Sequence, residues 1–106
     1  MPNPVVHFEI QSSDPEKSQT FFKELFEWHV EVVPEMGYGV VDTHAGGING
    51  GIGDTQDGQT HVTFYIEVDD LQAYLDKAET MGGKTVMPVT EIPGIVTMAL
   101  FSDPAG

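Results

Sequence analysis

Hydrophobic and polar residues alternate in two segments of the chain that share one pattern. Residues 5–11 read Val-Val-His-Phe-Glu-Ile-Gln, and residues 61–67 read His-Val-Thr-Phe-Tyr-Ile-Glu. Alternation with a period of two is typical of a β-strand with one apolar and one polar face. The repeated apolar residues are Val6, Phe8 and Ile10 in the first segment and Val62, Phe64 and Ile66 in the second. The repeat predicts two similar halves, each starting with a strand that leads into an acidic helix start.

The first half is expected to continue with a helix and three strands. Asp14, followed by a proline, predicts a helix N-cap and first turn. Apolar residues near helical spacing extend this helix to about Phe26. Strands are expected over 28–33 and 38–42, and the glycine-rich stretch 45–53 is expected to hold a further strand with its turns.

The glycine-rich stretch allows two interpretations. Glycine-rich loops cradle phosphates when a helix start and a suitably placed lysine follow them. Neither feature follows Gly53. The glycines are therefore expected to let a curved strand bend or to let a ligand approach the backbone.

The second half follows the same order but contains fewer strands. Asp69 with Gln72 resembles a capping box and predicts a second helix that ends at Gly82. Strands are expected over 84–89 and 95–101, joined by a Pro-Gly turn. The first half has three strands after its helix and the second has two, so the last strand is missing from the expected pattern.

A missing last strand would leave the strand at 95–101 with an open edge. Three explanations are open: a truncated chain, a short gene product, or a second chain that supplies the pairing by exchange. We therefore expect a homodimer, with exchanged elements as one form of it.

Composition narrows the classes of partner. The chain has 17 acidic residues against 4 lysines and no arginine, and its formal net charge is −13. This charge argues against nucleic acid or an anionic membrane as a partner, and the missing arginine argues against a multiply charged anionic substrate. With no cysteine, the chain has neither a thiolate nucleophile nor a cysteine-ligated metal. No signal pattern or long apolar run is present, so a cytoplasmic location is expected.

In their order and spacing, several short motifs resemble the vicinal oxygen chelate superfamily, which includes glyoxalases, bleomycin-resistance proteins and extradiol dioxygenases. They are the strand and helix start from His7 to Asp14 and the segments 46–51, 66–70, 82–84 and 103–106. The resemblance implies an α+β fold in which two βαβββ units form a curved mixed sheet, with helices on its outer face and a ligand on its concave face. It implies a single domain over 1–106, with a first unit at 1–53, a linker at 54–59 and a second unit at 60–106 that lacks its last strand.

The resemblance also implies ligand positions for a divalent metal, which the metal-dependent members bind. His7 matches the first position, seven residues before Asp14. The second, a histidine in the family, is Thr63 here, and His61 lies two residues earlier on the same strand face. The third, an acid in glyoxalases, falls at 48–50, where there is no carboxylate, and the fourth lies beyond the last residue. A conventional metal-dependent activity is therefore not predicted, and a divalent metal bound through His7 is kept as an alternative.

Strand alternation places the polar residues of the two repeated segments on one face. They are His7, Glu9, Gln11, His61, Thr63, Tyr65 and Glu67. Such a face is too polar for a dry core, so it is either the solvated side of a half-exposed sheet or a polar cleft that binds a ligand. The resemblance favours the cleft.

Within such a cleft, each candidate residue has an expected role. His7 is the candidate general base or metal ligand, and Glu9 and Tyr65 are the candidates that orient a substrate. The candidate ligand-binding residues are Asn49, His61 and Thr63. The leading hypothesis is a glyoxalase-like protein that acts on or binds a small molecule, with lyase- or isomerase-type acid–base chemistry. The alternative is a non-catalytic protein that sequesters a bleomycin-like, cationic or aromatic molecule, for which the acidic charge argues.

Overall fold

The computed structural model describes residues 2–33, 37–44, 46–55, 57–94 and 96–106. The chain forms two compact units, Met1–Glu67 and Val68–Gly106, which are described one at a time. The predicted linker at 54–59 separates the two copies of the sequence repeat and does not coincide with the boundary between these two units. The predicted division stays a prediction.

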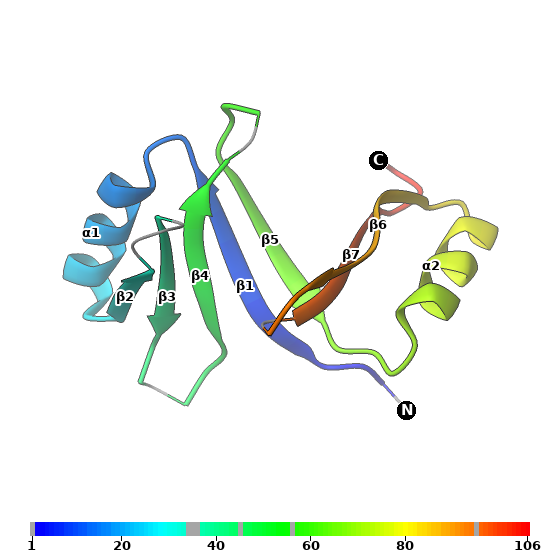
Figure 1. Cartoon of the computed structure of the whole chain (residues 1–106), viewed down its shortest axis with the longest axis horizontal. Helices are drawn as coiled ribbons and strands as arrows, with labels where there is room; N and C mark the ends of the chain where they lie inside the picture. Colours follow the sequence, from blue (N-terminus) through cyan, green and yellow to red (C-terminus); the bar gives the residue numbers. More distant parts are fainter. Residues whose placement is uncertain (1, 34–36, 45, 56, 95) are drawn as a thin grey trace. The chain divides into compact units, whose positions relative to one another are not determined.

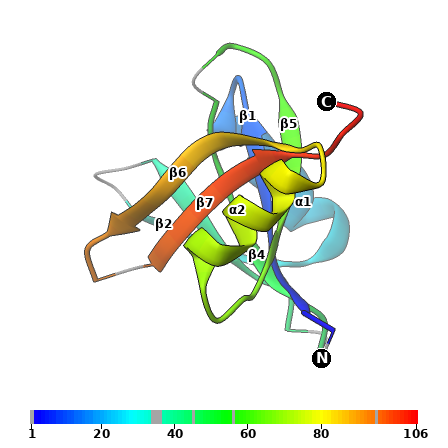
Figure 2. The same ribbon diagram turned by 90° about the vertical axis from the view of Figure 1, so that its right-hand side faces the viewer.

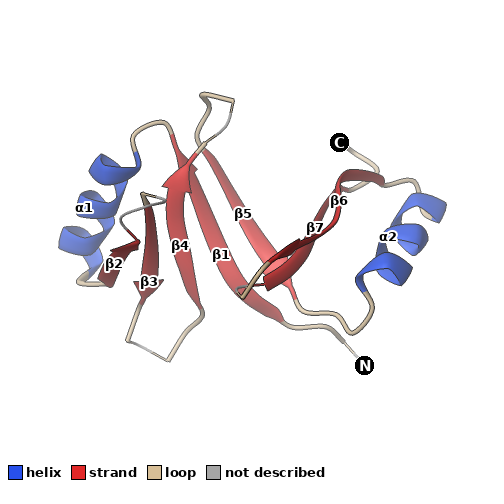
Figure 3. Cartoon of the chain, in the orientation of Figure 1, coloured by secondary structure: helices blue, strands red, loops and turns tan. Residues whose placement is uncertain are grey.

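The first unit consists of a five-stranded sheet and one helix (Figure 1). Its elements are β1 (Val5–Ser12), α1 (Pro15–Phe26), β2 (His29–Val33), β3 (Tyr38–Asp42), β4 (Asn49–Asp54) and β5 (His61–Ile66). The spatial order is β2-β3-β4-β1-β5, in which β1 is parallel to β4 and antiparallel to β5. The sheet is therefore mixed, and the predicted α+β class is confirmed (Figure 3).

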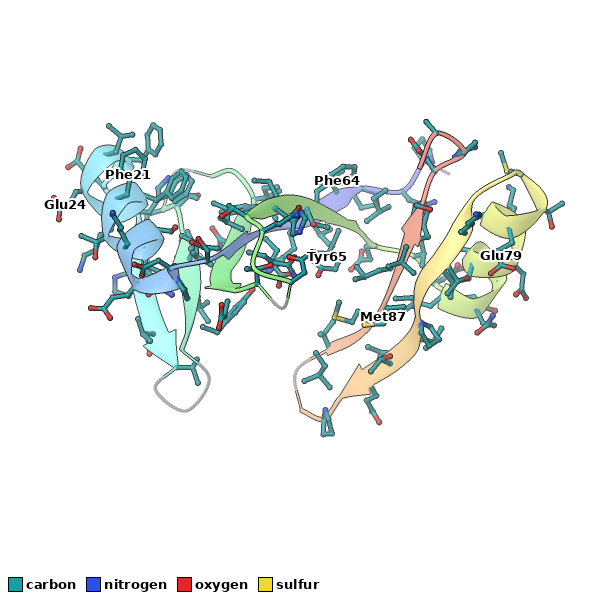
Figure 4. The ribbon with its side chains drawn as sticks, turned by 90° about the horizontal axis from the view of Figure 1, so that it is seen from above. Phe21, Glu24, Phe64, Tyr65, Glu79 and Met87 are labelled. Atoms are coloured by element: carbon teal, nitrogen blue, oxygen red, sulfur yellow. The ribbon has the colours of Figure 1, made fainter. Side chains whose placement is uncertain are left out.

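The two repeated strands, β1 and β5, are direct neighbours. Phe8 lies opposite Phe64, and His7 lies opposite Tyr65. Residues opposite each other in paired strands point to the same side of the sheet. The pairing therefore places the shared apolar positions on one face and the polar positions on the other, and Figure 4 shows Phe64 and Tyr65 on opposite sides of the strand.

The core of the first unit lies between α1 and the apolar face of the sheet. Ile10, Val41 and Ile52 are buried there, and they are flanked by partly buried side chains. These are Phe8, Phe22, Trp28 and Val30. The rings of Phe22 and Trp28 are stacked, with centroids 5.6 Å apart and planes 8° from parallel.

Helix α1 begins and ends as its sequence predicts. The Asp14 carboxylate accepts a hydrogen bond from the backbone N–H of Lys17 at 3.2 Å, which confirms the predicted N-cap. At the other end, Glu27 adopts a left-handed conformation with φ of 60°. The buried Gln19 amide ties the helix to the sheet by donating to the Ile52 carbonyl at 2.9 Å.

The second unit consists of α2 (Leu71–Thr80) and an antiparallel hairpin of β6 (Lys84–Ile92) and β7 (Val96–Ser102). Figure 2 shows this helix beside the two strands. The first predicted strand is longer than expected, and the predicted start of the second, at residue 95, lies outside the described residues. Among the described helices of the chain, none is long and apolar enough to cross a membrane.

The start of α2 corrects one prediction. The capping residue is Asp70, whose carboxylate accepts a hydrogen bond from the Ala73 N–H at 3.1 Å, and the predicted cap at Asp69 is wrong. Gln72 does not complete a capping box, because its amide donates to Asp76 instead. The predicted helix end is confirmed, since Gly82 has a φ of 101° that favours glycine.

Candidate functional site

The polar face of the first sheet brings together predicted site residues from β1, β4 and β5. His7 lies between Asn49 on β4 and Tyr65 on β5. Glu9 lies between Gly51 on β4 and Thr63 on β5. The strand pairing therefore gathers residues from distant parts of the sequence around the centre of β1.

The Glu9 carboxylate is the hub of a hydrogen-bond network on this face. The Tyr65 hydroxyl donates to its Oε1 at 3.0 Å, and the Tyr38 hydroxyl donates to its Oε2 at 3.3 Å. The Gln11 amide also donates to Oε1, at 3.1 Å. Hydrogen bonds to an ionised acceptor are stronger than neutral ones, so this network holds the carboxylate in one orientation.

Burial and the Glu9 carboxylate raise the pKa values of both tyrosines in this network. Burial, followed by the negative charge of Glu9, raises the pKa of Tyr38 well above its usual value. The same two causes raise the pKa of Tyr65. At neutral pH both phenols are therefore protonated and donate to the carboxylate.

Tyr38 is a residue of this network that the sequence did not predict, although the glycines of β4 are an indication that a large side chain crosses the strand. A Cβ atom on Gly51 would overlap the Tyr38 hydroxyl, and one on Gly53 would lie 2.6 Å from the ring carbon Cδ1. The Tyr38 ring therefore lies across β4 where side chains are absent. On the opposite face, a Cβ on Gly50 would collide with Phe8. The glycine run thus makes room for aromatic rings on both faces of β4.

His7 lies at the edge of this network. Its ring centroid is 5.7 Å from that of Tyr65, with the planes tilted by 56°. In the part of the chain that the structure describes, no residue forms a hydrogen bond with its imidazole. Within the described residues, a ligand that binds this half-buried imidazole would therefore displace no hydrogen-bond partner.

The other predicted ligand-binding residues differ in their surroundings. Asn49 accepts a hydrogen bond from the Thr43 N–H at 3.0 Å and so holds the end of the β3–β4 connection. His61 pairs with Asp57 through Nε2, 3.0 Å from Oδ2, at the start of β5. The Gln59 N–H and His61 lower the pKa of Asp57 to about 2. His61 is therefore held by the loop before β5, and Thr63 is the predicted β5 ligand residue that lies directly beside Glu9.

The donor set can be compared with the needs of a divalent metal. Such ions take several nitrogen and oxygen ligands at bonding distance. Among the described residues, no group of three or more histidines, aspartates or glutamates is placed to hold one. On the polar face His7 supplies one imidazole, and His61 is engaged with Asp57. These residues do not fit a conventional metal centre, and a metal bound through His7 stays a prediction.

The fold and the sequence together define the class of this protein. A family model described as the Glyoxalase/Bleomycin resistance protein/Dioxygenase superfamily matches residues 5–106. The chain belongs to this superfamily, which confirms the resemblance drawn from its motifs.

Two curated relatives are similar to the chain. The anthracycline biosynthesis protein DnrV of Streptomyces peucetius is 30% identical over 119 residues, which cover 93% of this chain and 42% of the relative. The anthracycline biosynthesis protein DauV of Streptomyces sp. (strain C5) is 29% identical over 119 residues, which again cover 93% of this chain and 42% of the relative. The chain thus spans less than half the length of the curated relatives that it matches.

Proposed function

We propose that the chain binds a small planar aromatic molecule with neighbouring hydroxyl and carbonyl groups, on the polar face of its first sheet. The observation that carries this proposal is the Glu9 carboxylate, which two phenols from β3 and β5 hold in place. A fixed carboxylate bordered by aromatic rings is a polar anchor next to stacking surfaces, the combination that ligand sites use.

The carboxylate has acceptor capacity left for a ligand. A carboxylate has about four lone-pair sites. Among the described residues, Oε1 of Glu9 accepts from Tyr65 and Gln11, whereas Oε2 accepts from Tyr38. A ligand hydroxyl would donate to Oε2, and the neighbouring ligand carbonyl would accept from the open imidazole of His7. The aromatic rings of Tyr38 and Tyr65 would contact the flat part of the ligand.

The relatives support the ligand class. Both are named as anthracycline biosynthesis proteins, and they match 93% of this chain. Anthracyclines are planar aromatic compounds. A chain of this net charge would also favour a neutral or cationic guest over an anionic one.

Titration with 1,4-dihydroxyanthraquinone, a planar hydroxy-carbonyl probe, tests this proposal. Glu9→Gln should weaken binding about tenfold or more, because a hydrogen bond to a charged group is worth about 1.5–3 kcal/mol. Glu31→Gln is the matched control, since Glu31 lies on β2 and its side chain is 80% exposed. Equal affinity of the wild-type chain and Glu9→Gln, or no binding by the wild-type chain, would refute the proposal.

A second candidate is acid–base chemistry at His7. The observation that favours it is the imidazole of His7 beside the anchor, which forms no hydrogen bond within the described residues, since a general base must have a nitrogen within reach of the substrate proton. His7 would remove the proton next to the ligand carbonyl and return it to a neighbouring atom.

Proton exchange separates this chemistry from binding alone. The α-protons of 2-hydroxyacetophenone, followed by NMR in D2O, should exchange faster with the wild-type chain than in buffer. His7→Ala should abolish the acceleration, and His61→Ala should keep it, because His61 is engaged by Asp57. If the wild-type chain binds the anthraquinone but does not accelerate exchange, the protein is a non-catalytic binder.

A further inference from the structure

Gln19 is a buried polar residue of α1, with an exposed fraction of 6%. Burial of an amide costs free energy unless hydrogen bonds satisfy it. Both hydrogens of this amide are used, because Nε2 donates to the Ile52 carbonyl at 2.9 Å and to the Gly37 carbonyl at 3.2 Å. An apolar residue would fill the same space without this requirement. The distinct contribution of Gln19 is therefore the link between these two carbonyls.

The two carbonyls belong to segments that strand pairing does not join at this point. Gly37 directly precedes β3, and Ile52 lies on β4 opposite Gly39. Among the described residues, the register between β3 and β4 begins at Gly39 and does not include Tyr38. The Gln19 amide therefore holds the start of β3 on β4 where the pairing of the two strands does not.

The Tyr38 side chain depends on where β3 starts, because its ring crosses β4 on the polar face. The ring lies against Gly51 and Gly53, and a Cβ atom at Gly53 would be 2.6 Å from its Cδ1. Its hydroxyl donates to Glu9 at 3.3 Å, which is long for a bond that usually measures about 2.5–3.0 Å. A further separation of roughly 0.3 Å would break it. The Glu9 network is therefore sensitive to the position of the first residues of β3.

We propose that Gln19 is a positioning residue of the binding face. From the apolar side of the sheet it fixes the start of β3 on β4, and this fixes the Tyr38 ring and its contact with Glu9 on the polar side. Gly39 belongs to the same arrangement, since a Cβ atom there would lie 2.8 Å from Nε2 of Gln19. The inference rests on the proposed function, which gives this network its ligand.

NMR of the folded chain tests the positioning without a ligand. The Hα resonances of Gly51 and Gly53 should carry ring-current shifts from Tyr38, and Tyr38→Ala gives their values without the ring. Gln19→Met keeps the length of the side chain but removes both donors, so it should move these resonances most of the way to the Tyr38→Ala values. Phe22→Leu is the matched control, since Phe22 lies on the same helix and packs on the core.

The control separates positioning from general packing. Phe22→Leu should lower the melting temperature and leave the two glycine resonances where they are in the wild-type chain. Wild-type resonances in Gln19→Met, or an equal displacement in Phe22→Leu, would overturn the inference.

A measurement on the wild-type chain covers the case in which Gln19→Met does not fold. Nuclear Overhauser effects should connect the side-chain amide protons of Gln19 with the Hα protons of Gly39, because the amide packs on this glycine. Their absence would show that the amide does not hold β3, and would overturn the inference.

Titration with 1,4-dihydroxyanthraquinone separates this inference from the proposed function. Gln19→Met should bind the probe as weakly as Tyr38→Ala, and Phe22→Leu should bind it as tightly as the wild-type chain. If the wild-type chain does not bind the probe, the proposed function fails and the glycine resonances alone decide the positioning. If Gln19→Met binds the probe as tightly as the wild-type chain, the proposed function stands and the positioning role is overturned.

Discussion

Gly51→Ala should destabilise the chain, although alanine is normally tolerated well in a strand. The added Cβ would overlap the hydroxyl group of Tyr38, which lies across β4. Tyr38 can then either stay and push the strands apart or swing out and lose its hydrogen bond to Glu9. Both outcomes disturb the network at the centre of the proposed binding face.

The size of the effect follows from these two outcomes. Forcing an extra methyl group into a packed site costs about 1–3 kcal/mol. Losing the phenol–carboxylate hydrogen bond costs a similar amount, about 1–3 kcal/mol. For a domain of this size, each kcal/mol lowers the melting temperature by roughly 4–8 °C. The expected change is therefore a fall of about 4–24 °C in the melting temperature, measured by thermal unfolding followed by circular dichroism.

Two further variants make this prediction specific. Gly47→Ala is the matched control, because a Cβ at Gly47 meets nothing within 4 Å and the melting temperature should hardly change. Tyr38→Ala should remove the penalty of Gly51→Ala, so that adding Gly51→Ala to it costs little. If Gly51→Ala is as stable as Gly47→Ala, or if the penalty persists without the tyrosine ring, the packing described for β4 is wrong.

Three other predictions concern the charged groups. In Glu9→Gln, the pKa values of Tyr38 and Tyr65 should fall but stay above the usual value because both rings are still buried, and absorbance titration at alkaline pH would measure this change. In the wild-type chain, the stability that these phenols contribute is complete below about pH 10 and is lost as the pH rises further. Because the pKa of Asp57 is lowered to about 2, its stabilising contribution should be present above about pH 4 and lost between about pH 4 and 2, so the difference in melting temperature between the wild-type chain and Asp57→Asn should shrink over this range. Asp70→Ala should lower the free energy of unfolding by about 1 kcal/mol in urea titrations, and Asp69→Ala should lower it much less, since only Asp70 caps α2; equal effects would contradict that capping assignment.

The order of elements could be predicted from the sequence because it depends on local signals. Alternation located β1 and β5, the acidic residue before a proline located the start of α1, and the glycine pair located the end of α2. The cap of α2 was placed one residue too early, because two adjacent aspartates offer the same chemistry. The backbone conformation at the start of α2 decides between Asp69 and Asp70, because it brings the Asp70 carboxylate to the Ala73 N–H.

The site was only partly predictable, because it depends on which strands are neighbours. Alternation placed Glu9 and Tyr65 on one face, and the β1–β5 pairing joins them. Tyr38 reaches Glu9 across β4, so its role depends on the order β3-β4-β1, which no local pattern gives. His61 is on the predicted strand, but the preceding loop brings Asp57 to it.

The central claim is that the polar face around Glu9 binds a planar hydroxy-carbonyl aromatic. The most direct measurement is the set of intermolecular nuclear Overhauser effects between the ring protons of 1,4-dihydroxyanthraquinone and the protein. Contacts to the ring protons of Tyr38 and Tyr65 are expected, because these rings border the carboxylate. Contacts to Val62 and Phe64 instead, on the opposite face of β5, would contradict the claim.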